Sequence, residues 1–116
     1  LVSDGAPARG VDAGPVSMGT SEGELGVDGI RTPEGVLAGA DLTLDRAVRN
    51  LAEITGDWVT SARAASAVPA AALDLADRGV VAPGRRADLV LLDDELRVVL
   101  TVVGGRVVHD PRGIAD

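Results

Sequence analysis

The sequence contains no cysteine and is almost without aromatic side chains. Of its 116 residues only Trp58 is aromatic, and Phe and Tyr are absent. The lack of cysteine excludes a disulfide framework, a thiolate metal site and a cysteine nucleophile. Hydrophobic residues still make up 46% of the chain. Its core must therefore be built from Ala, Val and Leu, which bury little area each, so we expect an isolated fold of this chain to be marginal.

Positive charge is also scarce. Eleven cations, all of them Arg, stand against 18 acidic residues and leave a net charge of −7. This balance argues against nucleic acid as a partner, because phosphate binding requires clustered Lys or Arg. The sequence has no run of about 18 apolar residues, so it predicts no membrane-spanning segment. It begins at Leu1 without an initiator Met and inside an expected strand, which favours a piece of a longer protein.

Local motifs for metal, nucleotide or triad chemistry are missing as well. The only imidazole is His109, and metal sites need three or four donors, so a surface position is the better interpretation of this residue. The serines lack a nucleophile elbow, and the glycines form no phosphate-binding loop between a strand and a helix. These patterns indicate neither a metal centre nor a nucleotide site.

The first four residues suit a strand that ends on a carboxylate, Asp4, and the turn Gly5-Ala6-Pro7 follows at once. In barrels of parallel strands the catalytic groups lie at the carboxyl ends of the strands. Asp4 is therefore a candidate catalytic residue. The alternative, open from these residues alone, is that Asp4 only stabilises an Asx turn.

The middle of the chain predicts short strands followed by helices. Residues 5–35 lack helical periodicity and are expected to contain short strands, with a small hairpin over 26–35. Apolar residues at helical spacing predict a helix from about Thr43 to Gly56, with a solvated charged face. A second helix is expected over Thr60–Ala67, and a third from Pro69 to Leu73.

The end of the chain predicts a small antiparallel sheet. Residues 87–93, 96–103 and 106–109 are rich in strand-forming residues, and Gly104-Gly105 is typical of a two-residue hairpin turn.

The stretch directly before the first expected helix, Leu37, Ala38, Gly39 and Ala40, consists mostly of residues with small side chains. Small residues there let a ligand approach backbone N–H groups near a helix N-terminus, although a loop packed under the hairpin explains them too.

Longer motifs carry a resemblance to a known family. Residues 78–93, RGVVAPGRRADLVLLD, and residues 102–108, VVGGRVV, resemble the C-terminal signature of the amidohydrolase superfamily, G-x-(I/V)-x-P-G-x-x-A-D-L-V-x-x-D with a final V-x-G-x-x-V hairpin. Residues 36–50, VLAGADLTLDRAVRN, resemble L-A-G-S-x-L-T-M-x-x-A-V-R-N of the N-acetylglucosamine-6-phosphate deacetylases. The opening LVSDG resembles their L-V-(T/S)-D-A at the end of the eighth barrel strand.

The resemblance implies an α/β fold, the C-terminal part of an amidohydrolase (β/α)8 barrel with its last strand and final helices, plus a small antiparallel β-segment. Residues 1–76 would then belong to the barrel domain and 77–116 to the small β-domain. The implied activity of the longer protein is metal-dependent hydrolysis of the N-acetyl group of N-acetylglucosamine-6-phosphate to glucosamine-6-phosphate and acetate. The fragment alone is expected to be inactive.

Site residues follow from the same resemblance. Asp4 matches the catalytic acid/base of the family, and Leu37, Ala38, Gly39 and Ala40 match its substrate-contacting loop. The ligands of a divalent metal ion, zinc or similar, are implied to lie upstream, so this chain contributes none. The implied partner is a phosphorylated amino sugar, the implied assembly a homodimer, and the implied location cytoplasmic.

Two alternatives remain beside this interpretation. One is another deacetylase, a deaminase or a cyclic amidase of the same superfamily that uses the same terminal Asp. The other is a non-catalytic, truncated chain with an interaction role. The chain departs from the deacetylase pattern at Gly5, Ala40 and Leu44, where Ala, Ser and Met are common. Ala40 cannot donate a hydroxyl hydrogen bond.

Overall fold

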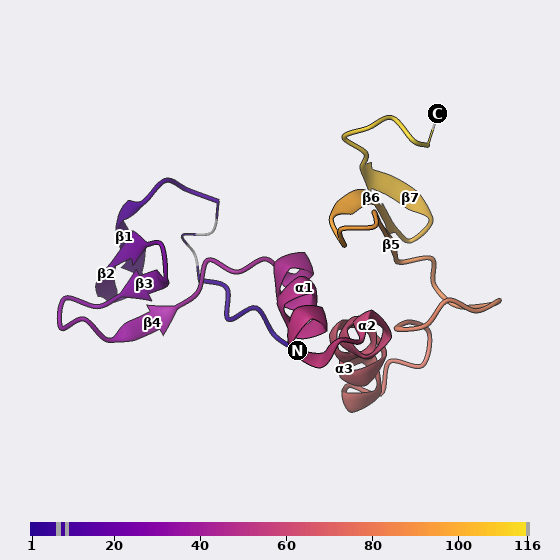
Figure 1. Ribbon diagram of the computed structural model, residues 1–116, viewed down its shortest axis with the longest axis horizontal. Coiled ribbons are helices and arrows are strands. Elements are labelled where there is room, and N and C mark those ends of the chain that lie inside the picture. The colour runs from indigo at the N-terminus through magenta and orange to yellow at the C-terminus, as the bar shows by residue number, and fades with distance from the viewer. Residues whose placement is uncertain (7, 9, 116) are drawn as a thin grey trace. The chain divides into compact units, whose positions relative to one another are not determined.

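The computed structural model describes residues 1–6, 8 and 10–115. Contacts divide the chain into two compact units, which we call the N-terminal unit (Val2–Ala47) and the C-terminal unit (Val48–Asp116, with Leu1). Over the described residues the elements run from four strands through three helices to three more strands (Figure 1). None of the helices in this described part is long and apolar enough to cross a membrane.

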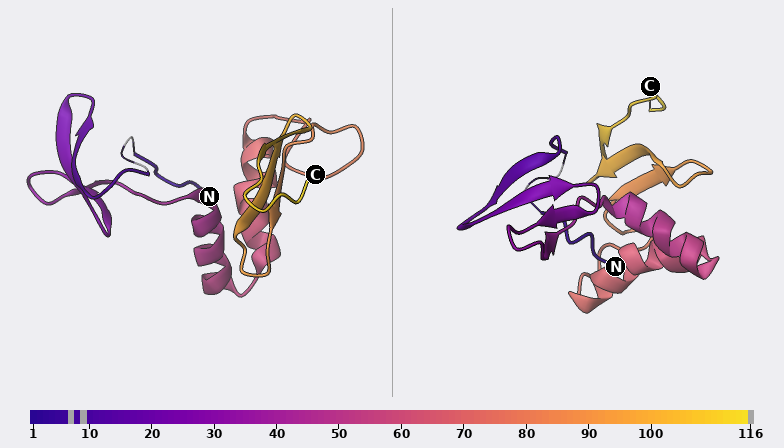
Figure 2. Two further views of the ribbon diagram at one scale, coloured as in Figure 1. Left: turned by 90° about the horizontal axis from the view of Figure 1, so that it is seen from above. Right: turned by 60° about the vertical axis from the view of Figure 1, so that its left-hand side comes forward.

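The N-terminal unit is a four-stranded antiparallel sheet in the order β1-β2-β3-β4 (Figure 2). Its strands are β1 Gly14–Met18, β2 Ser21–Gly26, β3 Gly29–Arg31 and β4 Leu37–Gly39. The expected short strands are therefore present. Of the hairpin expected over 26–35, the turn at 32–35 is confirmed, whereas the extended segment expected over 26–31 is interrupted at Val27 and Asp28 by the turn that joins β2 to β3. In that turn the Gly35 N–H donates to the Thr32 carbonyl at 2.8 Å.

The core of this unit is small because few of its side chains are large. Leu25 and Ile30 face each other across β2 and β3 and are only 4% and 1% exposed. Ala8 is buried with them. The half-buried side chains that pack against this cluster are Ala6, Val16 and Met18.

The first helix, α1, covers Leu44–Thr55 and crosses the division between the two units. It confirms the prediction from apolar spacing. Gly56 ends it with φ 68°, a left-handed conformation that glycine adopts without a steric penalty, and its N–H donates to the Ala52 carbonyl at 2.8 Å.

The next two helices correct the expected boundaries. α2, Trp58–Ala65, begins two residues before Thr60 because the Asp57 carboxylate caps it, accepting from the N–H groups of Val59 and Thr60. α3, Ala67–Ala72, begins before Pro69 rather than at it. Proline is tolerated there because an N–H in the first helical turn has no partner within the helix.

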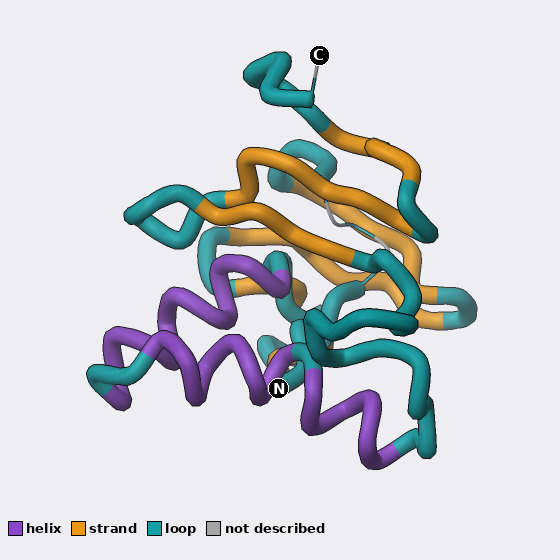
Figure 3. Tube along the Cα trace, turned by 90° about the vertical axis from the view of Figure 1, so that its right-hand side faces the viewer, coloured by secondary structure: helices purple, strands orange, loops and turns teal. Residues whose placement is uncertain are grey.

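The C-terminal unit ends in a three-stranded antiparallel sheet in the order β5-β6-β7 (Figure 3). Its strands are β5 Leu89–Leu92, β6 Val98–Val103 and β7 Arg106–His109. Gly104 and Gly105 have φ values of 56° and 80°, as a primed hairpin turn requires. The predicted tail sheet is therefore confirmed.

The strand predicted at Leu1–Asp4 does not form in this chain. Gly5 instead makes an isolated parallel bridge with Ala40. An inner barrel strand needs hydrogen-bonding neighbours on both sides, and Ala40 supplies a neighbour on one. Across the described residues the fold is a small α/β chain with two antiparallel sheets and no closed barrel. Pro7, the last residue of the predicted Gly5-Ala6-Pro7 turn, lies outside the described residues.

Candidate functional site

The structure brings Asp4 and the end of β4 together within the N-terminal unit. The Ala40 N–H donates to the backbone carbonyl of Asp4 at 2.9 Å, and the Ala6 N–H donates to the Ala40 carbonyl at 3.3 Å. These two bonds form the parallel bridge between Gly5 and Ala40. The candidate catalytic residue therefore lies beside the last residue of the candidate substrate-contacting stretch.

Asp4 has an unusual backbone conformation. Its φ is 49°, in the left-handed region that few residues other than glycine occupy, although aspartate tolerates it better than most. Such a conformation persists only where surrounding contacts fix it, and it is found often at functional sites. The residue is exposed. Its backbone is thus held while its carboxylate reaches solvent.

The Asx-turn interpretation of Asp4 does not fit this geometry. An Asx turn needs the N–H two residues on, which is that of Ala6, to donate to the aspartate side chain. That N–H donates to the Ala40 carbonyl instead. In the described part of the chain the Asp4 carboxylate has no such local partner.

Two glycines let the backbone segments approach this closely. Gly39 is buried, and a Cβ placed on it would lie 2.9 Å from the Cβ of Ala6. Gly29 has φ 115°, and a Cβ there would collide with the Gly39 carbonyl oxygen. The end of β4 is therefore packed between β3 and residues 4–6 with no room for side chains.

The four candidate substrate-contacting residues do not form a loop. Leu37, Ala38 and Gly39 make up β4, and a register shift of the kind that a β-bulge makes leaves Ala38 without a partner opposite Ile30 and Arg31. Leu37 and Ala38 are exposed, whereas Gly39 is buried. Small side chains at 37–40 are expected to leave backbone N–H groups open to a ligand, and of these groups the Ala40 N–H is bonded to the Asp4 carbonyl.

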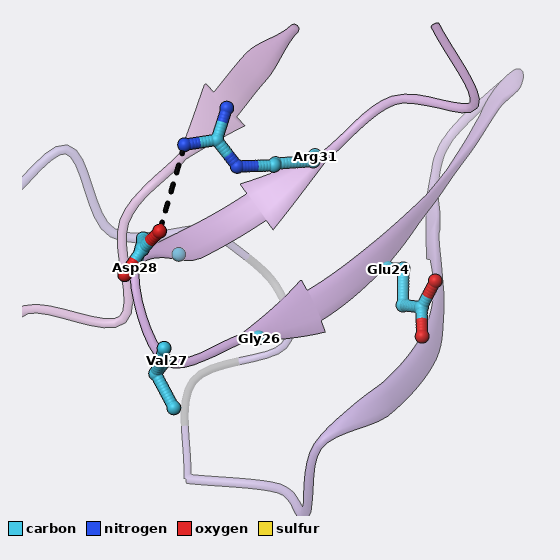
Figure 4. A pocket seen from close by; sticks show the side chains of 6 residues that line it. Glu24, Gly26, Val27, Asp28 and Arg31 are labelled. Atoms are coloured by element: carbon cyan, nitrogen blue, oxygen red, sulfur yellow. Dashed lines mark ion pairs between the residues drawn. The ribbon is translucent and has the colours of Figure 1, made fainter. Parts of the chain in front are cut away.

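A shallow hollow of about 220 Å³ lies at the turn between β2 and β3 (Figure 4). Arg31 and Asp28 pair across it at 3.6 Å, and both side chains are largely exposed, so the pair contributes little stability. The hollow does not include Asp4 or Leu37–Ala40. Its lining residues are Glu24, Gly26, Val27, Asp28, Gly29 and Arg31.

The metal ion implied by the resemblance does not fit the residues described here. Among residues 1–6, 8 and 10–115 no cluster of three or more His, Asp or Glu side chains is placed to hold a metal ion. His109 lies exposed at the end of β7. We therefore assign no step of the chemistry to a metal held by this chain.

Two charged residues of the family motifs turn out to join segments that are far apart in sequence. Asp88 accepts from the Gly104 N–H at 2.7 Å and from Arg86 Nε at 2.8 Å. These bonds, that of Gly104 first, hold the pKa of Asp88 below its usual value.

On α1, half-buried Arg49 donates to the Leu96 carbonyl at 2.9 Å. This bond corrects the expectation that the charged face of the helix is wholly solvated. The only sequence signal for either role was its place in a motif.

Comparison with known proteins gives the following findings. The profile of the amidohydrolase family matches residues 6–108, which includes Leu37–Ala40 and begins just after Asp4. A crystal structure of N-acetylglucosamine-6-phosphate deacetylase from Thermotoga maritima is 39% identical, with a TM-score of 0.89 over 95% of this chain and 31% of that one. An N-acetylgalactosamine-6-phosphate deacetylase of Escherichia coli O157:H7 is 37% identical over 111 residues.

The matches also show how much of each relative the chain represents. It spans 29% of the Escherichia coli deacetylase, and that match uses 92% of this chain. An adenine deaminase of Methylobacterium nodulans is 44% identical over 69 residues, which are 58% of this chain and 12% of the deaminase. This chain is thus similar to less than a third of each of these proteins.

Proposed function

Because the chain belongs to the amidohydrolase family, we propose that it is the C-terminal part of an enzyme that hydrolyses a carbon–nitrogen bond. The substrate in this proposal is N-acetylglucosamine-6-phosphate, and the products are glucosamine-6-phosphate and acetate. Support comes from the similarity to the Thermotoga maritima deacetylase at 39% identity. The proposal keeps residues 1–76 in the barrel domain of the longer protein and 77–116 in its small β-domain.

The single observation that carries the proposal is the pairing of Asp4 with Ala40. This pairing joins the residue that the family resemblance identifies as the acid/base, Asp4, to the stretch that it identifies as substrate-contacting, Leu37–Ala40. Asp4 is the catalytic residue in this proposal. As the base it takes a proton from the water that attacks the amide carbonyl, and as the acid it returns a proton to the leaving nitrogen. An exposed carboxylate on a fixed backbone suits both steps.

Substrate contacts are proposed for Leu37, Ala38, Gly39 and Ala40. The exposed surface of Leu37 and Ala38 makes these two the direct contacts, whereas Gly39 and Ala40 act by shaping the backbone. A divalent metal ion, zinc or similar, belongs to the proposal only for the longer protein, with its ligands outside this chain. The homodimer and the cytoplasmic location are proposed from the resemblance alone.

The test is a comparison of Asp4→Asn with wild type in the longer protein, with N-acetylglucosamine-6-phosphate and added divalent metal. Loss of a general acid/base lowers kcat by about 10²- to 10⁴-fold. Asp12→Asn is the matched control, because Asp12 is an exposed aspartate of the same unit that makes no part of the site. Equal activity of Asp4→Asn and wild type would show that Asp4 does not transfer the protons.

A second candidate is hydrolytic deamination, since an adenine deaminase is 44% identical over 69 residues. The two functions differ in their products, because a deacetylase releases acetate and a deaminase releases ammonia. The same protein is therefore assayed with N-acetylglucosamine-6-phosphate, N-acetylgalactosamine-6-phosphate and adenine in parallel. Ammonia from adenine without acetate from either sugar would favour the deaminase. A preference for N-acetylgalactosamine-6-phosphate would support the proposed deacetylation but would show that the proposed substrate is wrong.

A further inference from the structure

Asp4 is held in its left-handed conformation by Ala40, the residue directly after β4. Its φ of 49° is sparsely populated for a residue with a side chain. Among the described residues, the backbone bond to its carbonyl oxygen comes from the Ala40 N–H, at 2.9 Å. Rotation of Asp4 toward an ordinary strand conformation would turn this carbonyl away from Ala40. The Ala40 bond therefore fixes the direction in which the Asp4 side chain leaves the backbone.

Gly39 makes this bond possible. It is buried in β4, directly before Ala40, and a Cβ built on it would lie 2.9 Å from the Cβ of Ala6 and 3.8 Å from the Asp4 carbonyl oxygen. Real Cβ atoms essentially never come within 3.0 Å of a heavy atom outside their own and the two adjacent residues. A side chain at position 39 must therefore push residues 4–6 away from β4. Since Ala6 is itself bonded to the Ala40 carbonyl, both bonds of the bridge would lengthen together.

We propose that Gly39 is a positioning residue for Asp4, and that the absence of a side chain at position 39 sets the place of the catalytic carboxylate. The inference rests on the proposed acid/base role of Asp4. Gly39 acts through the backbone of residues 4–6 and Ala40, and its own contact with substrate is not required. A misplacement of about 1 Å at a reacting group lowers turnover by about 100-fold.

The experiment compares Gly39→Ala with Gly26→Ala in the longer protein. Gly26 lies on β2 of the same sheet, its φ is outside the left-handed region, and a Cβ there meets nothing within 4 Å. We expect Gly39→Ala to lower kcat by about 10- to 100-fold with less than a threefold change in KM, since orientation and not binding is lost. Gly26→Ala is expected to match wild type in both constants.

The double variant Ala6→Gly/Gly39→Ala separates the collision from other effects. Ala6→Gly removes the methyl group that the new Cβ would meet, so at least half of the lost kcat should return. A direct loss of substrate contact at position 39 would instead raise KM and would not be rescued by a change at Ala6. Equal kcat for Gly39→Ala and Gly26→Ala, or no rescue by Ala6→Gly, would overturn the proposal.

Hydrogen exchange of the Ala40 amide provides a readout that does not depend on activity. In alanine-labelled protein followed by NMR, this amide should be protected in wild type, at least 10-fold less protected in Gly39→Ala and protected again in the double variant. Unchanged protection in Gly39→Ala would overturn the proposal even for a longer protein with another substrate. Asp4→Asn in the same series tests the acid/base role separately, so failure of the function and failure of the positioning are distinguished.

Discussion

Replacement of Gly79 by alanine is expected to destabilise the C-terminal unit for two reasons, a strained backbone conformation and a steric collision. Gly79 has φ 86°, and the left-handed conformation costs a residue with a side chain about 1–2 kcal/mol. A Cβ there would also lie 2.6 Å from the Cβ of Ala70 and 3.1 Å from the Ser66 carbonyl oxygen. Forced overpacking of this kind adds about 1–3 kcal/mol. The free energy of unfolding should therefore fall by about 2–5 kcal/mol in total.

Gly84→Ala is the matched control, because Gly84 has nearly the same φ, 77°, and a Cβ there meets nothing within 4 Å. It should lose only the backbone part, about 1–2 kcal/mol. Both free energies are measured by urea denaturation of the longer protein. Both variants should keep the wild-type kcat below the unfolding transition, since Gly79 and Gly84 lie outside the unit that contains Asp4. Equal losses for the two variants would refute the reasoning from the collision with Ala70.

Two further predictions concern the bonds that tie the C-terminal unit together. Arg49→Met removes the donor to the Leu96 carbonyl and should lower the free energy of unfolding, measured by urea titration, by about 1 kcal/mol. The control is Arg46→Met, because Arg46 is exposed on the same helix. Equal free energies of unfolding for the two variants would contradict the prediction. The Gly104 N–H first, and then the Arg86 side chain, hold the pKa of Asp88 below its usual value. Its contribution to stability is therefore complete above the unfolded pKa near 3.9 and is lost as the pH falls through the lower folded value. The melting temperature should fall in that acid range and fall less in Asp88→Asn.

The elements with local signals could be predicted from the sequence. The helix α1 was found because its apolar residues recur at helical spacing and Gly56 follows them. The tail hairpin was found because Gly104-Gly105 separates two strand-like runs. In both cases neighbouring residues determine the conformation, so no knowledge of distant contacts was needed.

Errors in the helix boundaries came from weighting one local signal above another. The sequence prediction starts α2 at Thr60, although Asp57 is available as an N-cap and its carboxylate makes the capping bonds. Pro69 was assigned the first position of α3, although proline fits anywhere in the first turn. These boundaries were within reach of the sequence.

The exact strands β1–β4 were not within its reach. Their segments are short and rich in glycine, and what defines them is the cross-strand register, for example Leu25 opposite Ile30. The strand expected at Leu1–Asp4 had suitable residues but lacked the second neighbour that a barrel provides. Strand pairing depends on residues far apart in the chain, so propensity alone could not decide it.

Sequence motifs and geometry give different information about the candidate site. Motif resemblance selects Asp4 and Leu37–Ala40 separately, and the bridge between Gly5 and Ala40 joins them. Because Ala40 holds Asp4 through its backbone N–H, the hydroxyl that Ala40 lacks is not needed for this contact. Any residue with a free backbone N–H could serve at position 40, whereas position 39 tolerates only glycine next to Ala6. The departure from the family pattern at Ala40 is therefore compatible with the proposed chemistry of Asp4, and the constraint on the site lies one residue earlier.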